Sequence, residues 1–170
     1  YDVVMKTITA DAFAILRPTS PFRSAETIRR AWQEFQEKQP CDSIRAVEKG
    51  PNPWKMWFYR DEKLDWFNPS EDGHWRSVIN GKRMHEVASD EQITPLHSMP
   101  SQMAPTLYMQ NASLEISWTR NVTENCSISG DVIKPFFTQG YEGFDVNTEE
   151  DFILAEALIE RGLAKLPGVK

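Results

Sequence analysis

The chain has 170 residues, a formal net charge of −6 and a hydrophobic share of 40%. This length allows one domain with a sizeable core, and the composition is that of an ordinary soluble globular protein. The acidic balance, without a cluster of Lys and Arg, argues against nucleic-acid binding, and no apolar run approaches the ~20 residues that span a membrane. Cys41 and Cys126 lack metal-site spacing and no signal peptide is visible, so we expect reduced thiols in a cytoplasmic protein.

The first fifty residues predict a strand, a loop, a helix and a second strand. The apolar run at residues 12–16 is typical of a buried strand in a parallel sheet. Two prolines then make residues 17–23 a loop. A second strand is expected over residues 42–48, which gives a right-handed βαβ unit and hence an α/β fold.

The helix of this unit is expected over about residues 25–37. Ser24 can cap its first turn, whereas Thr27 does not complete a capping box. Apolar residues recur at the spacing of an amphipathic helix and share one face. They are Ile28, Ala31, Trp32 and Phe35. We therefore expect this face to pack against the sheet.

The middle of the chain predicts a hairpin and a long polar segment. Aromatic-rich residues at 56–59 and 64–67 look like the two strands of a hairpin. The chain is polar with weak periodicity from about 68 to 105, which we interpret as an extended excursion from a single domain covering residues 1–170. A further strand, central in the sheet, is expected over residues 107–116.

The last forty residues predict a strand and a helix. The strand is expected over residues 132–137, and the helix over about 149–161. Asn147 or Thr148 caps this helix, and Gly162 stops it. The residues that we expect on its buried face are Phe152, Ala155, Leu158 and Ile159.

Asp145 and Asn147 are candidate metal ligands. They are two residues apart at a strand end, so their side chains lie on the same face of an extended segment. Two oxygen donors suit Mg²⁺, which takes one or two carboxylates, waters and substrate phosphates, and open α/β sheets bind ligands outside the carboxyl ends of their strands. The alternative is a polar strand end with a helix cap, in which Glu149, Glu150 and Asp151 stabilise the helix dipole.

Four segments, in order along nearly the whole chain, resemble motifs of the acylneuraminate-type cytidylyltransferases, the family of CMP-sialic acid synthetases. Residues 17–23 (RPTSPFR) resemble the family's Q/R-P-T-S-P-x-R loop, and residues 52–55 (NPWK) its H-P-x-K segment. Residues 110–112 (QNA) resemble its x-N-G/A strand start. Residues 142–152 resemble its closing motif, in which D-x-D/N precedes a T/P-E-x-D helix start.

This resemblance implies a Rossmann-like, three-layer nucleotide-diphospho-sugar transferase fold, truncated at its N-terminus. It implies a nucleotidyltransferase that transfers CMP from CTP to an acidic sugar, such as a sialic acid or related nonulosonate, and releases pyrophosphate. It also implies a Mg²⁺ cofactor and a homodimer, in which an extended excursion of one subunit completes the neighbour's site.

The family's site residues carry over onto the matching positions. Asp145 matches the first metal aspartate and is the expected catalytic residue, while the neutral Asn147 is a weaker ligand in the second position. Lys55 matches a lysine that holds the sugar, and Arg17, in place of a glutamine, can fork onto a carboxylate. The remaining expected substrate-binding residues are Thr19, Ser20, Arg23, Gln110 and Asn111. The alternatives are surface ion pairs for the two arginines and a solvated loop residue for the lysine.

Two departures from the family bear on function. The Gly-rich loop that cradles the triphosphate has no counterpart, because Tyr1 begins past that point. The family has an Arg-Gln pair shortly before the strand expected at residues 107–116. The arginine of this pair is missing here, where the matching residues are Ser101 and Gln102. We therefore expect this chain alone to be inactive or severely impaired. The alternatives are a non-catalytic binding or dimerisation module, and a nucleotidyltransferase for another nucleotide or a non-acidic sugar.

Overall fold

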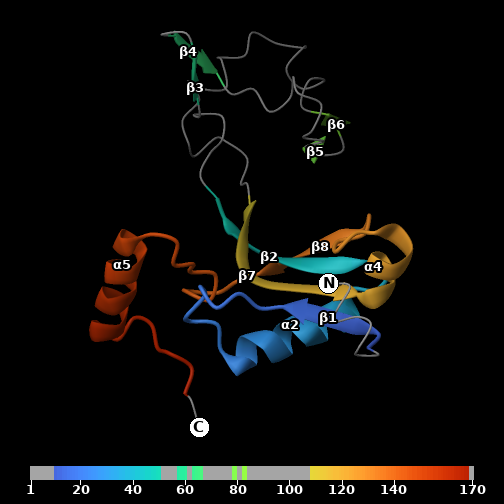
Figure 1. The fold of residues 1–170 in the computed structure, drawn as a ribbon, viewed down its shortest axis with the longest axis horizontal. Helices are drawn as coiled ribbons and strands as arrows, with labels where there is room; N and C mark the ends of the chain where they lie inside the picture. The colour runs from blue at the N-terminus through green and yellow to red at the C-terminus, as the bar shows by residue number, and fades with distance from the viewer. Residues whose placement is uncertain are drawn as a thin grey trace. The chain divides into compact units, whose positions relative to one another are not determined.

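Figure 1 shows the fold in a computed structural model of the chain. The structure describes residues 10–50 and 108–168, and between them the backbone of four short strands. The chain divides into two units, Tyr1–Glu48 with Met109–Lys170, and Lys49–Tyr108. The described part of the first unit is built on a four-stranded sheet, and that of the second on two-stranded sheets.

The sheet of the first unit has the strand order β1-β7-β2-β8. β1 (Ala12–Ile15) pairs antiparallel with β7 (Tyr108–Trp118), and β2 (Ser43–Lys49) pairs parallel with β8 (Ile133–Phe137). The backbone N–H of the last residue of β7 donates to the carbonyl of Asp42, just before β2, at 3.3 Å. The neighbours β7 and β2 therefore run in opposite directions, and the carboxyl ends of β1, β2 and β8 lie at the same edge as the first residues of β7.

This mixed sheet agrees with the sequence on the α/β class and on the central place of β7. The prediction that β1 lies buried in a parallel sheet is wrong. β1 is an edge strand with an antiparallel neighbour, its residues are only partly buried, and Leu16 just after it is 40% exposed. A short apolar run does not distinguish an edge strand from an inner one.

Helix α2 (Ala25–Glu37) connects β1 to β2 and begins at a capping box. The Ser24 hydroxyl accepts from the N–H of Thr27 at 3.1 Å, and the Thr27 hydroxyl accepts from the N–H of Ser24 at 3.3 Å. The threonine hydroxyl thus accepts from the N-cap backbone, as the Glu or Gln side chain does in the usual capping box. The expectation that Thr27 does not complete a capping box is therefore wrong. Figure 1 shows α2 lying along one face of the sheet.

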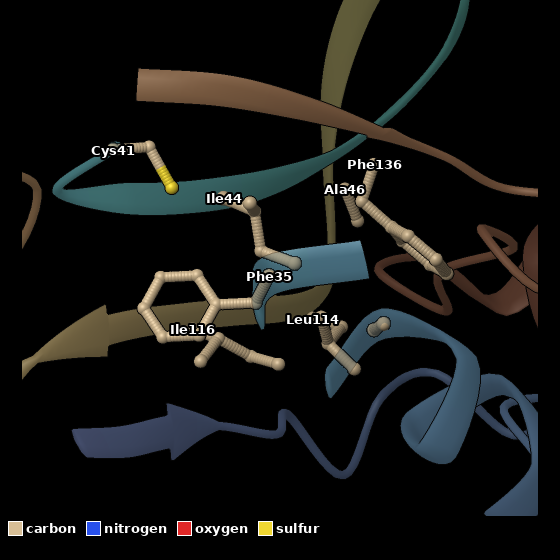
Figure 2. Packing of buried hydrophobic residues seen from close by; sticks show 8 residues of the cluster. Phe35, Cys41, Ile44, Ala46, Leu114, Ile116 and Phe136 are labelled. Atoms are coloured by element: carbon tan, nitrogen blue, oxygen red, sulfur yellow. The ribbon is translucent and has the colours of Figure 1, made fainter. Parts of the chain in front are cut away.

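The core lies between α2 and this face of the sheet (Figure 2). Alternate residues of β2 and β7 point to it, as the two-residue period of a strand requires. Its fully or almost fully buried members are Ala31, Phe35, Cys41, Ile44, Ala46, Leu114, Ile116 and Phe136. The Phe35 ring contacts that of Trp118, with 4.8 Å between centroids. Trp32, expected on the buried face of α2, is 41% exposed.

Helices α4 (Thr119–Asn125) and α5 (Glu149–Glu160) complete the described part of the first unit. Thr148 caps α5 in a second capping box with Asp151, and the backbone and side-chain donors at residues 147 and 148 lower the pKa of the Asp151 carboxyl. Ala155 and Leu158 are buried as expected, in a small cluster with Phe22 and Ala164.

The expectation that Phe152 and Ile159 share the buried face of α5 is wrong, because they are 57% and 39% exposed. The apolar residues of α5 surround the helix, so periodicity alone does not select the buried side. Among the described residues, no helix is long and apolar enough to cross a membrane. Both cysteines are free thiols, Cys41 buried and Cys126 exposed.

The described part of the second unit consists of two antiparallel pairs of strands. β3 (Trp57–Arg60) pairs with β4 (Lys63–Trp66), which confirms the predicted hairpin. β5 (Val78–Ile79) pairs with β6 (Lys82–Arg83) within the segment interpreted as an excursion. The rest of that segment, like Lys55, lies outside the described residues.

Candidate ligand cavity at the carboxyl ends of the strands

A cavity of about 420 Å³ opens at the sheet edge where β1, β2 and β8 end. Glu48 near the end of β2 and residues 109–112 at the start of β7 form one side of it. The loop after β8 forms the other side, through Gly140, Tyr141, Gly143, Phe144, Asp145 and Asn147. This position is the one at which open α/β sheets bind their ligands.

The loop after β1 and the loop after β8 pack against each other beside this cavity. The backbone N–H of Val146 donates to the carbonyl of Thr19 at 2.9 Å. The Phe22 ring contacts that of Phe144, with 5.5 Å between centroids, and that of Tyr141, with 6.4 Å. Two segments that are far apart in the sequence, 17–23 and 142–152, thus share one corner of the fold.

Glu142 fixes the loop after β8 to helix α2. Its carboxylate accepts from the Thr27 hydroxyl at 2.7 Å and from the backbone N–H of Gln139 at 2.8 Å, and it forms a close ion pair with Arg30. The Arg30 guanidinium also lies 4.3 Å from the centre of the Phe136 ring. One carboxylate therefore links the cavity wall to the helix and, through Arg30, to the core.

Asp145 and Asn147 lie together at the cavity, as the sequence predicts, but they belong to the loop after β8 and not to the expected strand end. The Asn147 amide Nδ2 donates to Asp145 Oδ2 at 3.0 Å. Asp145 Oδ1 is buried and has no hydrogen-bond partner among the described residues. An orphaned carboxylate oxygen in a ligand cavity fits a divalent cation that takes its other ligands from water and phosphate. Asp145 therefore suits a Mg²⁺ ion, whereas Asn147 presents its amide N–H to its neighbour.

Asn111 is buried at the cavity but is already bonded within the protein. Its Oδ1 accepts from the hydroxyl of Ser113 at 2.7 Å, and its Nδ2 donates to the hydroxyl of Thr138 at 3.1 Å. That hydroxyl donates in turn to the carbonyl of Val47 at 3.1 Å. Gln110, also at the cavity, is exposed and donates to Glu115 at 3.4 Å. Asn111 therefore shapes the cavity floor more than it reaches a ligand.

The four predicted residues of the loop after β1 do not line the cavity. Arg17 is half exposed, and its guanidinium lies 3.7 Å from Glu115 Oε1. Arg23 donates to the carbonyl of Arg17 at 3.0 Å and to that of Ser113, and burial lowers the pKa of its guanidinium. Ser20 is buried and Thr19 is exposed, and their positions are fixed by the loop. Arg23 is thus a loop anchor rather than a surface ion pair.

Glu115 and Arg45 form a buried ion pair on the face of the sheet opposite the core. Glu115 comes from β7 and Arg45 from β2, and Arg45 also donates to the hydroxyl of Ser129. The sequence gives no sign of this pair, because its members belong to strands that become neighbours only in the folded sheet. It connects Arg17 and Gln110, which both contact Glu115, to the interior.

Glu48 is the cavity residue that the sequence interpretation missed. It stands near the end of β2, whereas Asp145 lies in the loop after β8, and no family motif includes it. Partial burial raises the pKa of its carboxyl. A signal was available, because a carboxylate at the carboxyl end of a predicted parallel strand is placed at the ligand-binding edge of an α/β sheet.

Comparison of the chain with models of known protein families found no match, and comparison with curated proteins found none either. The cavity is therefore interpreted from its own residues and from the motifs of the sequence.

Proposed function

We propose that this chain carries the metal and acceptor side of a cytidylyltransferase, which transfers CMP from CTP to an acidic sugar and releases pyrophosphate. The observation that carries the proposal is the contact between two motif segments beside one cavity, which is lined by the second of them. Residues 17–23 and 142–152 are joined by the bond from Val146 to Thr19, at the sheet edge where ligands bind. We further propose that the mixed sheet belongs to a Rossmann-like, three-layer nucleotide-diphospho-sugar transferase fold.

In the proposed reaction, a hydroxyl of the sugar attacks the α-phosphorus of CTP. A new P–O bond forms as the hydroxyl proton passes to water, the bond to the bridging oxygen of the β-phosphate breaks, and pyrophosphate leaves with the electron pair. Asp145 would hold Mg²⁺, which would offset the charge on the phosphate oxygens. Arg17 is exposed and free to turn from Glu115 toward a sugar carboxylate, with its backbone held by Arg23.

The test is pyrophosphate release by the full-length protein with CTP, Mg²⁺ and a panel of acidic sugars. We expect release with at least one sugar, and a loss of about a hundredfold or more for Asp145→Asn. Glu149→Gln is the matched control, because Glu149 is an exposed acid in the first turn of α5 and does not line the cavity. Folded protein that releases no pyrophosphate with any sugar contradicts the proposal.

A dimerisation module is a second candidate, because helix α5 and the segment after it expose several large apolar side chains although Ala155 and Leu158 are buried. The exposed side chains are Phe152, Ile153, Leu154, Ile159, Leu163 and Leu166. A helix that is apolar all round is normally buried, and large exposed apolar patches mark interfaces. Sedimentation and CTP calorimetry discriminate between the candidates, since a stable dimer that binds no CTP favours the module.

A further inference from the structure

The hydrogen bond between Asn147 and Asp145 removes one of the two oxygen ligands that the sequence predicts for a metal ion. Because the amide Nδ2 of Asn147 donates to Asp145 Oδ2, the amide oxygen is directed away from that carboxylate. Two neighbouring residues that bind the same cation would both present oxygen to it. Asp145 therefore needs a different partner if the cavity holds a divalent ion.

Glu48 comes to the same cavity from the end of β2. Its Oε2 lies 2.8 Å from the point where a side chain on Gly143 would begin, and Gly143 is two residues before Asp145. Among the described residues, no hydrogen bond or ion pair is made to the Glu48 carboxylate. No lysine or arginine lines the cavity in the described part of the chain.

Other partly or fully buried carboxylates of the first unit are compensated. Glu115 pairs with Arg45, and Glu142 pairs with Arg30. Asp42 accepts from two backbone N–H groups, at 2.8 and 2.9 Å. Glu48 and Asp145 lack a cationic partner among the described residues, and both lie at the cavity. A cation bound in this cavity would offset the charges of two carboxylates that have no cationic partner among the described residues.

The neutral polar groups of the cavity are partly engaged within the protein. The amides of Asn111, Gln110 and Asn147 each donate one of their two N–H groups to a protein oxygen, at 3.1, 3.4 and 3.0 Å. The charged side chains in the cavity lining are the carboxylates of Glu48 and Asp145. Hard cations such as Mg²⁺ and Mn²⁺ prefer this chemistry.

We propose that Glu48 is the second carboxylate that holds the divalent cation of this cavity, in the role that the sequence assigns to Asn147. The inference rests on the proposed function, which calls for Mg²⁺ at Asp145. It adds a ligand from β2 to one from the loop after β8, so that the ion joins two elements at the sheet edge.

The experiment is a titration with Mn²⁺ alone, in which electron paramagnetic resonance measures the free ion. We expect Glu48→Gln to raise the Kd for Mn²⁺ about tenfold or more, as Asp145→Asn does. The control Glu149→Gln should leave the Kd nearly unchanged, and Asn147→Ala, which removes only a hydrogen bond to the Asp145 carboxylate, should raise it less than Glu48→Gln does. Thermal unfolding of each variant without metal checks folding, and the two cavity variants should still unfold cooperatively.

Three results overturn the inference and separate it from the proposed function. If Glu48→Gln binds Mn²⁺ as the wild type does while Asp145→Asn does not, Glu48 is no ligand and the proposed function stands. If Asn147→Ala loses binding and Glu48→Gln does not, the second ligand is the asparagine. If the wild type binds no Mn²⁺, or neither carboxylate matters, the inference fails together with the metal corner of the proposed function.

Discussion

Gly143 shows how a single residue sets the shape of the cavity. A Cβ at this position would lie 2.3 Å from Asn111 Nδ2, and 2.8 Å from both Glu48 Oε2 and Thr138 Oγ1. Three polar side chains from β2, β7 and the end of β8 thus converge on the space that a larger residue would fill. The backbone of Gly143 is not in the left-handed region, so its conformation does not call for glycine. Glycine is required here because these three side chains approach the backbone closely.

We therefore expect Gly143→Ala to displace Asn111 and to lower the free energy of unfolding by about 1–3 kcal/mol, the usual cost of overpacking. Urea denaturation measures this change. The matched control is Gly168→Ala, because nothing lies within 4 Å of the added Cβ, and it should stay within about 0.5 kcal/mol of the wild type. Equal stabilities for the two variants would show that the three side chains move aside freely.

At the scale of elements, the ion pair between Glu142 and Arg30 determines how α2 and the loop after β8 fit together. Both side chains are about three-quarters buried, with 21% and 26% of their side-chain areas exposed. The same carboxylate also accepts from the Thr27 hydroxyl and from a backbone N–H. Loss of its charge leaves these donors with a poorer partner in a place that water reaches little.

We expect Glu142→Gln to destabilise the fold by about 1–3 kcal/mol, because it weakens several buried hydrogen bonds at once. Glu26→Gln is the matched control on the same helix. It breaks the pair with Arg29, whose members are 82% and 73% exposed, and such surface pairs contribute about 0–1 kcal/mol. Chemical denaturation of both variants provides the comparison. A control that costs as much as Glu142→Gln would contradict the special role of the buried carboxylate.

At the scale of the whole molecule, local sequence patterns predicted which helices and strands form better than they predicted which strands are neighbours in the sheet. The amphipathic period of α2 and the two aromatic-rich segments of the β3–β4 hairpin are local, and the structure has the helix and the paired strands. The antiparallel contact between β1 and β7 joins residues that are about a hundred positions apart. Period and propensity carry no information about that pairing, which depends on how the sheet assembles.

The candidate site follows the same rule. Asp145 and Asn147 are neighbours in the chain, so their proximity was predictable, and Thr19 was placed near them by the motif resemblance. Glu48 and Glu115 are important only because β2 lies beside β7. Arg17, expected to meet a ligand, lies next to Glu115. Residues that contact each other across strands cannot be paired from one sequence, because every strand offers several registers.

The strand order also predicts that the first unit folds without the second. β2 ends at Lys49 and β7 begins at Tyr108, and these neighbouring strands run in opposite directions, so the two ends meet at one sheet edge. Antiparallel neighbours can be joined by a short turn. We expect a variant in which a turn of about four residues containing Asn-Gly replaces residues 50–107 to unfold cooperatively in urea.

Phe35 is completely buried in the first unit. Phe35→Ala should therefore lower the free energy of unfolding by about 3–5 kcal/mol in both the shortened and the full chain. A shortened chain without a cooperative transition, or one indifferent to Phe35→Ala, would show that the core of the sheet depends on the second unit.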